Sequence, residues 1–139
     1  MSDNAQRLQR FMDEVWNTGN VAAVDLFLAD RYTIHSDPGD PWEGQTLSRE
    51  GFKQRLAASR APFPDLRFEL SDIVADGDRV AASWIMRGTQ LGALGGRPSS
   101  GRSIEVRGMT IYYFADGRIT GHRQVVDRLT VAQQLGLAG

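Results

Sequence analysis

Two alternating segments joined by a tight turn constrain this chain more than any other feature. In LRFELSDIVADGDRVAASWIMRGTQLG, which begins at Leu66, apolar and polar residues alternate on both sides of a DGD turn. This pattern is typical of a β-hairpin, because successive side chains of a strand point to opposite faces. One face of the second strand carries Val80, Ala82, Trp84 and Met86. The hairpin therefore predicts an antiparallel sheet with one apolar face.

The segments on either side of this hairpin predict the remaining elements. Residues 4–20 carry apolar side chains at three- and four-residue spacing, which predicts a helix, and a second helix is expected over 21–30. A short strand in RYTIHSD and a helix in SREGFKQRLAASR follow. After the Gly-rich stretch GALGGRPSSGR, the segments SIEVRGMTIYYF and ITGHRQVVD form a second hairpin, and LTVAQQLG a final helix. Helices first and hairpins afterwards predict an α+β fold, with helices on one face of a curved, mostly antiparallel sheet.

Length and composition exclude several classes of protein. A chain of 139 residues fits one domain, 1–139, and its net charge of -1 gives no basic surface for nucleic acid. The chain has no cysteine, which excludes disulfides, thiolate metal sites and a cysteine nucleophile. The N-terminus lacks a signal-peptide pattern, and no run approaches the roughly 18 apolar residues that span a bilayer. We therefore expect a cytoplasmic protein that does not bind a membrane.

One acidic residue occurs in a segment whose apolar residues otherwise predict burial. In VVDRLTVAQQLG, Asp127 follows two valines and precedes Arg128 and Leu129. Aspartate is favoured at the N-cap of a helix, and a helix is expected to begin directly after it. Alternatively, apolar neighbours would raise its pKa from about 3.9 and make it a general base. The sequence leaves both roles open.

Three quoted stretches carry a family resemblance. They are FPDLRFELSDIVADGDRVAASW, GGRPSSGRSIEVRG and FADGRITGHRQVVDRLTVAQQLG. From Tyr32 to Gly136 the chain resembles the SnoaL-like polyketide cyclases of the nuclear-transport-factor-2-like superfamily. The resemblance implies a cone-shaped α+β barrel, in which a bent sheet wraps an apolar cavity that the N-terminal helices close. It also implies a sheet-face homodimer.

Members of that family with known activity close a ring in an aromatic polyketide ester by intramolecular aldol condensation, without metal or organic cofactor. The resemblance therefore implies a cyclase or isomerase without a cofactor, acting on a small hydrophobic carbonyl compound. It assigns the acid/base role to Asp127. Two positions depart from the family pattern, because Gly121 stands where an acid is common and Arg123 where a tryptophan is common. Strand alternation puts both on the side of Asp127 and places His122 outside the cavity.

The candidate site residues follow from this interpretation. Asp127 is the expected base, and His35, in YTIHSD, a second candidate for proton transfer. Arg123 could stabilise the developing oxygen anion. Four further residues are expected to line the cavity or to pack in the core, and are the candidates for substrate binding: Tyr32, Trp42, Trp84 and Met86.

Two other functions stay open. A hydrolase related to the epoxide hydrolases of the same superfamily would use two aspartates and an arginine to activate water; the chain offers Arg123 and Asp127 but no second aspartate of matching parity on a neighbouring strand. A binding domain would perform no chemistry. The acidic residues of DPGDPWEGQT, which are Asp37, Asp40 and Glu43, are interpreted as turn residues rather than as a metal site.

Overall fold

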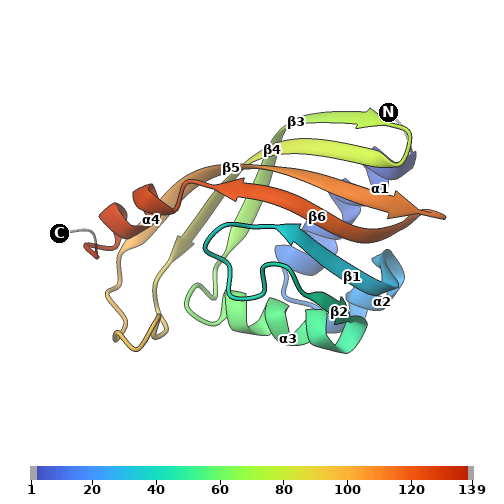
Figure 1. Ribbon diagram of the computed structural model, residues 1–139. Coiled ribbons are helices and arrows are strands. Elements are labelled where there is room, and N and C mark those ends of the chain that lie inside the picture. The colour runs from blue at the N-terminus through green and yellow to red at the C-terminus, as the bar shows by residue number, and fades with distance from the viewer. Residues whose placement is uncertain (1–2, 138–139) are drawn as a thin grey trace.

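A curved sheet of six strands in the order β2-β1-β6-β5-β4-β3 organises the protein (Figure 1). The computed structural model describes residues 3–137. The strands are β1 (Leu28–Ser36), β2 (Thr46–Ser48), β3 (Arg67–Asp76), β4 (Arg79–Thr89), β5 (Ser103–Ala115) and β6 (Arg118–Val126). All neighbours pair antiparallel except β1 and β6, which are parallel. The predicted α+β fold with a curved, mostly antiparallel sheet is confirmed, although the sheet is mixed and does not close into a barrel.

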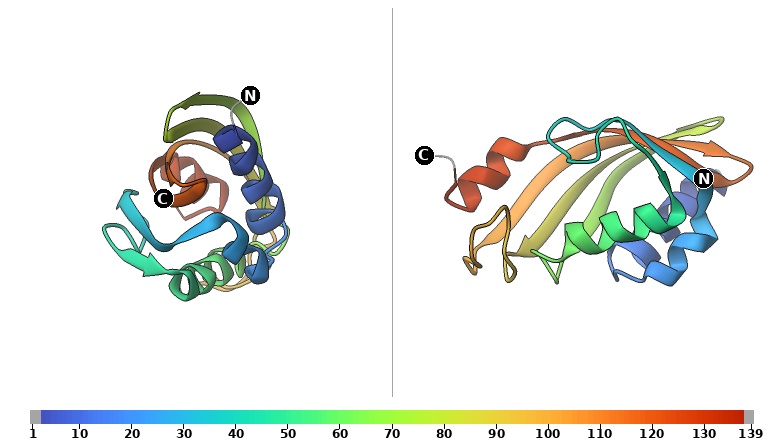
Figure 2. Two further views of the ribbon diagram at one scale, coloured as in Figure 1. Left: turned by 90° about the vertical axis from the view of Figure 1, so that its right-hand side faces the viewer. Right: turned by 60° about the horizontal axis from the view of Figure 1, so that its bottom comes forward.

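The helices lie mainly on the inner face of this sheet (Figure 2). They are α1 (Asp3–Phe11), which continues as a π-helical turn η1 (Met12–Trp16), the 3-10 turn η2 (Val21–Ala23), α2 (Val24–Phe27), α3 (Arg49–Arg60) and α4 (Arg128–Gln134). Ser48 caps α3 by accepting a hydrogen bond from the Gly51 N–H at 3.0 Å. The helix predicted over 21–30 ends at Phe27, because Leu28 already pairs with Ile119 of β6. None of the helices within residues 3–137 is long and apolar enough to cross a membrane.

Aromatic side chains fill the space between the helices and the inner face. Phe11 of α1 contacts Phe27 and Phe52 with ring centroids 5.9 and 6.1 Å apart, and Phe52 contacts Tyr32 at 4.9 Å. All four are buried. Tilted and edge-to-face pairs of this kind add about 0.5–1.5 kcal/mol each beyond the burial of their area. The face predicted from the β4 alternation is confirmed, since Val80, Ala82 and Trp84 are buried and Met86 is half-buried against the core.

The two edges of the sheet are short or obstructed. At one edge β2 spans only three residues. At the other, β3 shifts its register between Leu70 and Asp72. Near the start of β3 the Asn17 side chain occupies the free backbone of Phe68, donating to its carbonyl at 3.0 Å and accepting from its N–H at 2.7 Å. An amide side chain thus stands where another strand would pair.

The outer face of the sheet remains open to solvent among the described residues. Val74, Met109 and Val125 are each 67% exposed there. They surround a hollow of about 530 Å³ with mostly apolar walls, whose lining also includes Asp72 and Arg123. Large apolar side chains gathered on one face are typical of a surface that binds another protein or a ligand.

Gly108 of β5 permits the packing of the central tryptophan. It pairs with Trp84 of β4, whose indole ring lies where a Cβ at position 108 would stand. We predict that Gly108→Ala lowers the free energy of unfolding by about 1–3 kcal/mol, because the ring must move within a packed core. Gly51→Ala is the control, since a Cβ there meets only ordinary contacts at 3.5 Å. Urea unfolding of both variants measures the difference, and equal stability would contradict this packing.

Candidate active site

Asp37 lies directly after β1 and is fully buried. The loop that follows turns back along the strand, because Gly44 N–H donates to the Ile34 carbonyl at 2.8 Å. The Asp37 N–H donates to Glu43 Oε2 at 2.7 Å, which holds the start of the loop. The strand alternation of Tyr32 and Ile34, both buried, ends where this backbone turns. The carboxylate is thereby brought against β6, α3 and α4.

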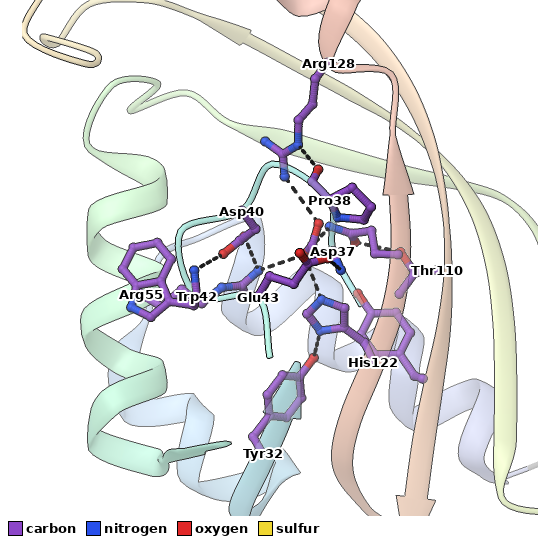
Figure 3. A network of polar contacts seen from close by, with 12 residues as sticks. Tyr32, Asp37, Pro38, Asp40, Trp42, Glu43, Arg55, Thr110, His122 and Arg128 are labelled. Atoms are coloured by element: carbon purple, nitrogen blue, oxygen red, sulfur yellow. Dashed lines mark hydrogen bonds and ion pairs between the residues drawn. The ribbon is translucent and has the colours of Figure 1, made fainter. Parts of the chain in front are cut away.

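Four side chains from three elements donate hydrogen bonds to the Asp37 carboxylate (Figure 3). On β6, His122 Nε2 lies 2.9 Å and Gln124 Nε2 3.1 Å from Oδ2. Arg55 of α3 approaches Oδ2 at 3.5 Å, and Arg128 of α4 approaches Oδ1 at 3.3 Å. We call these residues, together with Tyr32, the Asp37 cluster.

The protonation states within the Asp37 cluster follow from burial and charge. Burial raises the pKa of Asp37, but the hydrogen bond of His122, its charge once it is protonated at acidic pH, and the charges of Arg55 and Arg128 outweigh it, so this pKa lies below its ordinary value. Burial lowers the pKa of His122, and its hydrogen bond to Asp37 reverses only part of that. Burial also raises the pKa of Tyr32 well above its ordinary value. At neutral pH we therefore assign an ionised Asp37, a neutral His122 and a protonated Tyr32.

These states assign one direction to the hydrogen bonds. A neutral imidazole has one N–H donor and one acceptor nitrogen. Nε2 faces the Asp37 carboxylate, which only accepts, so Nε2 carries the proton. Nδ1 then accepts from the Tyr32 hydroxyl. Tyr32, His122 and Asp37 thus form a continuous line along which a proton can move toward the carboxylate.

A second line of hydrogen bonds orients the amide of Gln124. The Trp84 indole N–H donates to Thr110 Oγ1 at 2.9 Å, and the Thr110 hydroxyl donates to Gln124 Oε1 at 2.7 Å. With its oxygen engaged there, the Gln124 amide presents its NH₂ group to Asp37. Trp84 and Thr110 therefore orient the Gln124 side chain so that its amide nitrogen faces the Asp37 carboxylate.

Arg55 is a buried cation in the same cluster. It is 4% exposed and lies beneath two aromatic rings, with Cζ 5.6 Å from the Trp16 and 5.9 Å from the Phe52 ring centroid. One nitrogen, Nη2, bridges Asp37 and Asp40, at 3.5 and 2.9 Å. Within residues 3–137 its Nε is the one buried side-chain nitrogen or oxygen without a hydrogen-bond partner. A buried donor without an acceptor costs about 1–3 kcal/mol, which an oxygen atom of a ligand could recover.

The expectation that Asp127 lies in a dry, apolar cavity is wrong. Its side chain is exposed and accepts hydrogen bonds from the Thr130 hydroxyl at 2.6 Å and the Thr130 N–H at 3.1 Å. It is the N-cap of α4, the alternative that the sequence left open. These two hydrogen bonds hold its pKa below the ordinary value, the reverse of what a general base requires. Together with Met109 and Val125, Asp127 lines an open hollow on the outer face of the sheet, which the helices do not cover.

His35 and Arg123 lie on the outer face of the sheet, away from the Asp37 cluster. Both are exposed. The His35 ring packs edge-on against Tyr113 at 5.2 Å, and Arg123 Nε donates to the Tyr113 hydroxyl at 3.1 Å. Neither residue therefore contacts the buried carboxylate of Asp37, and their expected roles in catalysis stay predictions.

The other predicted residues lie on the inner side. Tyr32 belongs to the Asp37 cluster and Trp84 supports it, whereas Met86 and Trp42 are half-buried against the core. The placement of His122 outside the cavity is wrong. Alternation correctly separated it from Arg123, but which face becomes internal depends on where the helices pack.

Sequence reasoning missed the buried roles of Asp37 and Arg55. A signal for Arg55 was present, since it shares one side of its helix with Phe52 and Leu56, both of which are buried. Asp37 follows the alternating strand that contains Tyr32 and Ile34, but its prolines and glycines are equally typical of an exposed turn. Within residues 3–137 no group of three or more histidine, cysteine or acidic side chains is arranged to hold a metal ion.

Comparison with known proteins identifies the family. The sequence model of the SnoaL-like polyketide cyclases matches residues 6–135. The chain belongs to this family. No curated protein matches it.

Solved structures agree with membership of the SnoaL-like family. A candidate polyketide cyclase from Acidithiobacillus ferrooxidans is 44% identical with a TM-score of 0.93, covering 99% of this chain and 97% of that one. IdmH, a candidate polyketide cyclase from Streptomyces antibioticus, is 30% identical with a TM-score of 0.81, covering 96% and 98%. A candidate SnoaL-like polyketide cyclase from Jannaschia sp. CCS1 is 25% identical with a TM-score of 0.82, covering 99% and 93%.

We predict that the His122 ring remains neutral down to a pH below the value of about 6.5 at which a free imidazole titrates. An unfolded chain binds this proton near pH 6.5, whereas the folded chain binds it only at lower pH. The free energy of unfolding therefore falls as the pH drops from about 6.5 through the folded pKa. Because the pKa of Asp37 is also lower in the folded chain, the free energy of unfolding falls further as Asp37 is protonated at more acidic pH.

Two measurements check this prediction. NMR titration of the ring carbons follows His122 directly, and a His35→Gln variant assigns its signal, because the chain has only two histidines. Urea unfolding at pH 7 and pH 5 measures the loss of stability. A ring that titrates above the ordinary imidazole value would contradict the assigned states.

Proposed function

We propose that this SnoaL-like protein is an enzyme that closes a ring in a hydrophobic, polyketide-like carbonyl compound by general acid–base catalysis. One observation carries the proposal. The His122 ring lies between the Asp37 carboxylate and the Tyr32 hydroxyl, within hydrogen-bond distance of both, on the face that the helices cover. Membership of a family named for polyketide cyclases supports the reaction class.

The proposed reaction is an intramolecular aldol condensation. A carbon next to one carbonyl loses a proton and forms a bond to a second carbonyl carbon, whose oxygen then takes up a proton. In our proposal the Tyr32 oxygen receives the proton from carbon as the Tyr32 hydroxyl proton moves to His122 Nδ1. The proton returns by the same path to the new alkoxide, so the product has the mass of the substrate.

Asp37 and Arg55 would have separate electrostatic roles in this reaction. The ionised Asp37 holds the Nε2–H tautomer of His122 and stabilises the imidazolium that forms, as a buried carboxylate does in hydrolytic triads. Arg55 carries positive charge and an unpartnered Nε–H beside the same carboxylate. A buried donor of this kind is suited to an oxygen that becomes negative.

Partly uncovered apolar side chains of the core support an apolar substrate. Several are half-buried: Trp42, Phe68, Met86, Leu94 and Val131. Uncovered apolar area stabilises a hydrophobic ligand by roughly 25 cal/mol per Å² removed from water. We therefore propose a substrate with aromatic or long apolar parts next to its carbonyl groups.

Activity of matched variants tests the proposal. The protein is incubated with a panel of aromatic polyketide esters, and mass spectrometry follows a chromatographic shift without change of mass. We expect His122→Gln and Asp37→Asn to lower kcat by about a hundred- to ten-thousand-fold, the usual contribution of acid–base catalysis. Asp127→Asn should remain within a few-fold of the unchanged protein, because asparagine also caps helices.

Circular dichroism and thermal unfolding verify that each variant folds. Tyr32→Phe removes one hydroxyl and leaves the ring, so it tests the proton path with a minimal change in packing. Full turnover by the His122 variant, or loss confined to Asp127→Asn, would refute the assignment of the base.

Epoxide hydrolysis is a second candidate because of one ion-pair arrangement. Arg55 Nη2 bridges Asp37 and Asp40, which supplies the two aspartates and one arginine that such a hydrolase uses to activate water. Hydrolysis adds one water to the substrate, whereas the aldol reaction conserves mass. Asp40→Asn should abolish hydrolysis and spare ring closure, so the same mass spectra discriminate the two reactions.

We also propose that two copies associate through the outer face. Its hollow has Asp72 on β3 and Arg123 on β6, so a twofold axis would bring the acid of one copy toward the base of the other. We predict that Val125→Asp yields monomers in size-exclusion chromatography with light scattering. Leu26→Asp is the control, since Leu26 is 61% exposed on α2, away from this face. A monomeric unchanged protein would refute the dimer.

A further inference from the structure

Arg128, the first residue of α4, connects that helix to the loop after β1. Its Nε donates to the Pro38 carbonyl at 2.7 Å, and its Nη2 lies 3.3 Å from Asp37 Oδ1 (Figure 3). The side chain crosses Gly39, where a Cβ would overlap it. Gly39 has a φ of +92°, which glycine adopts readily. The loop is thus shaped to let an arginine from another element reach the carboxylate.

The position of Arg128 depends on how α4 is held. The helix has seven residues, and a free helix shorter than about 12 residues is marginal in water. Asp127 caps its start, and near its end Gln134 pairs with both backbone groups of Glu105, at 2.8 and 3.0 Å. Leu135 is buried beyond the last turn. The cap is the tether nearest to Arg128.

We propose that Arg128 is a positioning residue for Asp37, and that Asp127 acts on the site by capping α4 and so holding Arg128 in place. The inference rests on the proposed function, because it concerns the carboxylate of the same site. Under this inference Asp127, directly after β6, affects the site through α4 and Arg128, and is not itself the base. Arg128 contacts Asp37 Oδ1, which leaves Oδ2 for His122 and Gln124.

The groups around Asp37 determine in which direction its pKa moves when Arg128 is replaced. Asp37 faces the cation Arg55 of α3, and on β6 the neutral His122 and Gln124. Tyr32 of β1 reaches it through His122, and Asp40 and Glu43 belong to its own loop. Arg128 is the cation from α4 and one cause of the depressed Asp37 pKa. Without it, the carboxylate holds its proton more strongly. Because the Arg128 side chain is 42% exposed, solvent screens part of this effect.

The first experiment removes the cation. Carboxyl-detected NMR follows the Cγ signal of Asp37, assigned with Asp37→Asn, in the unchanged full-length protein and in Arg128→Met. We expect the Asp37 titration to move upward by roughly 0.5–1 pH unit. Arg31→Met is the matched control, since Arg31 is exposed on β1 and loses the same charge. Arg128→Lys should give an intermediate shift, because lysine keeps the charge without the paired donors.

The second experiment separates the cap from the charge of Asp127. Asp127→Ala removes both, and Asp127→Asn removes the charge but keeps a cap. Loss of a nearby negative charge alone would lower the Asp37 pKa. We expect Asp127→Ala to raise it instead, by releasing Arg128, and Asp127→Asn to leave it unchanged or slightly lower. Amide hydrogen exchange of residues 129–134 checks that the alanine variant loosens α4.

The outcomes discriminate this inference from the proposed function. An Asp37 titration that is unmoved in Arg128→Met, or lowered in Asp127→Ala despite a loosened α4, would overturn the inference. Neither result depends on turnover. If Asp37 titrates as expected while His122→Gln keeps full activity, the positioning role stands and the proposed function fails. With a substrate in hand, the acidic limb of kcat against pH should move upward in Arg128→Met by the same interval.

Discussion

The carboxylate of Asp37 has no contact with solvent, and a charge without water must be matched by donors of the protein itself. Those donors come from β6, α3 and α4, so the position of one side chain determines where three elements meet. Removing one partner of a buried ion pair costs about 3–5 kcal/mol, so a single substitution among these buried residues lowers the free energy of unfolding. The same requirement leaves His122 neutral and oriented, with an N–H committed to the carboxylate.

Parallel pairing of β1 with β6 makes this meeting possible. Ile34 pairs with His122, so the end of the first strand lies beside the inward-facing positions of the last. The loop after β1 can then deliver Asp37 to His122 and Gln124 within hydrogen-bond distance. If β1 were antiparallel to β6, the end of β1 would lie at the opposite end of β6, and the loop that carries Asp37 would not be beside Gln124. The parallel pairing of β1 and β6 therefore determines which side chains can reach Asp37.

Local patterns predicted most of the fold, and a part of the site. Alternation around the DGD turn gave β3 and β4, and the predicted common face of Val80, Ala82 and Trp84 is buried. Alternation divides a strand into two faces without saying which is internal, and for that reason His122 was assigned to the wrong side. The parallel β1–β6 pair joins segments almost ninety positions apart, and no local pattern reports it. Asp37 was missed because a proline- and glycine-rich turn looks the same whether its first residue is buried or exposed.

The obstructed edges of the sheet bear on how the protein assembles. β2 spans only three residues, and on the β3 edge the Asn17 amide occupies both backbone groups of Phe68, so a neighbouring chain meets few free backbone groups at the β2 edge and at the start of β3. Growth by strand addition, which has no natural end, is thereby disfavoured. In the dimer that we propose, the copies meet on the broad sheet surface, where a twofold arrangement is complete after two molecules and cannot propagate into a fibre.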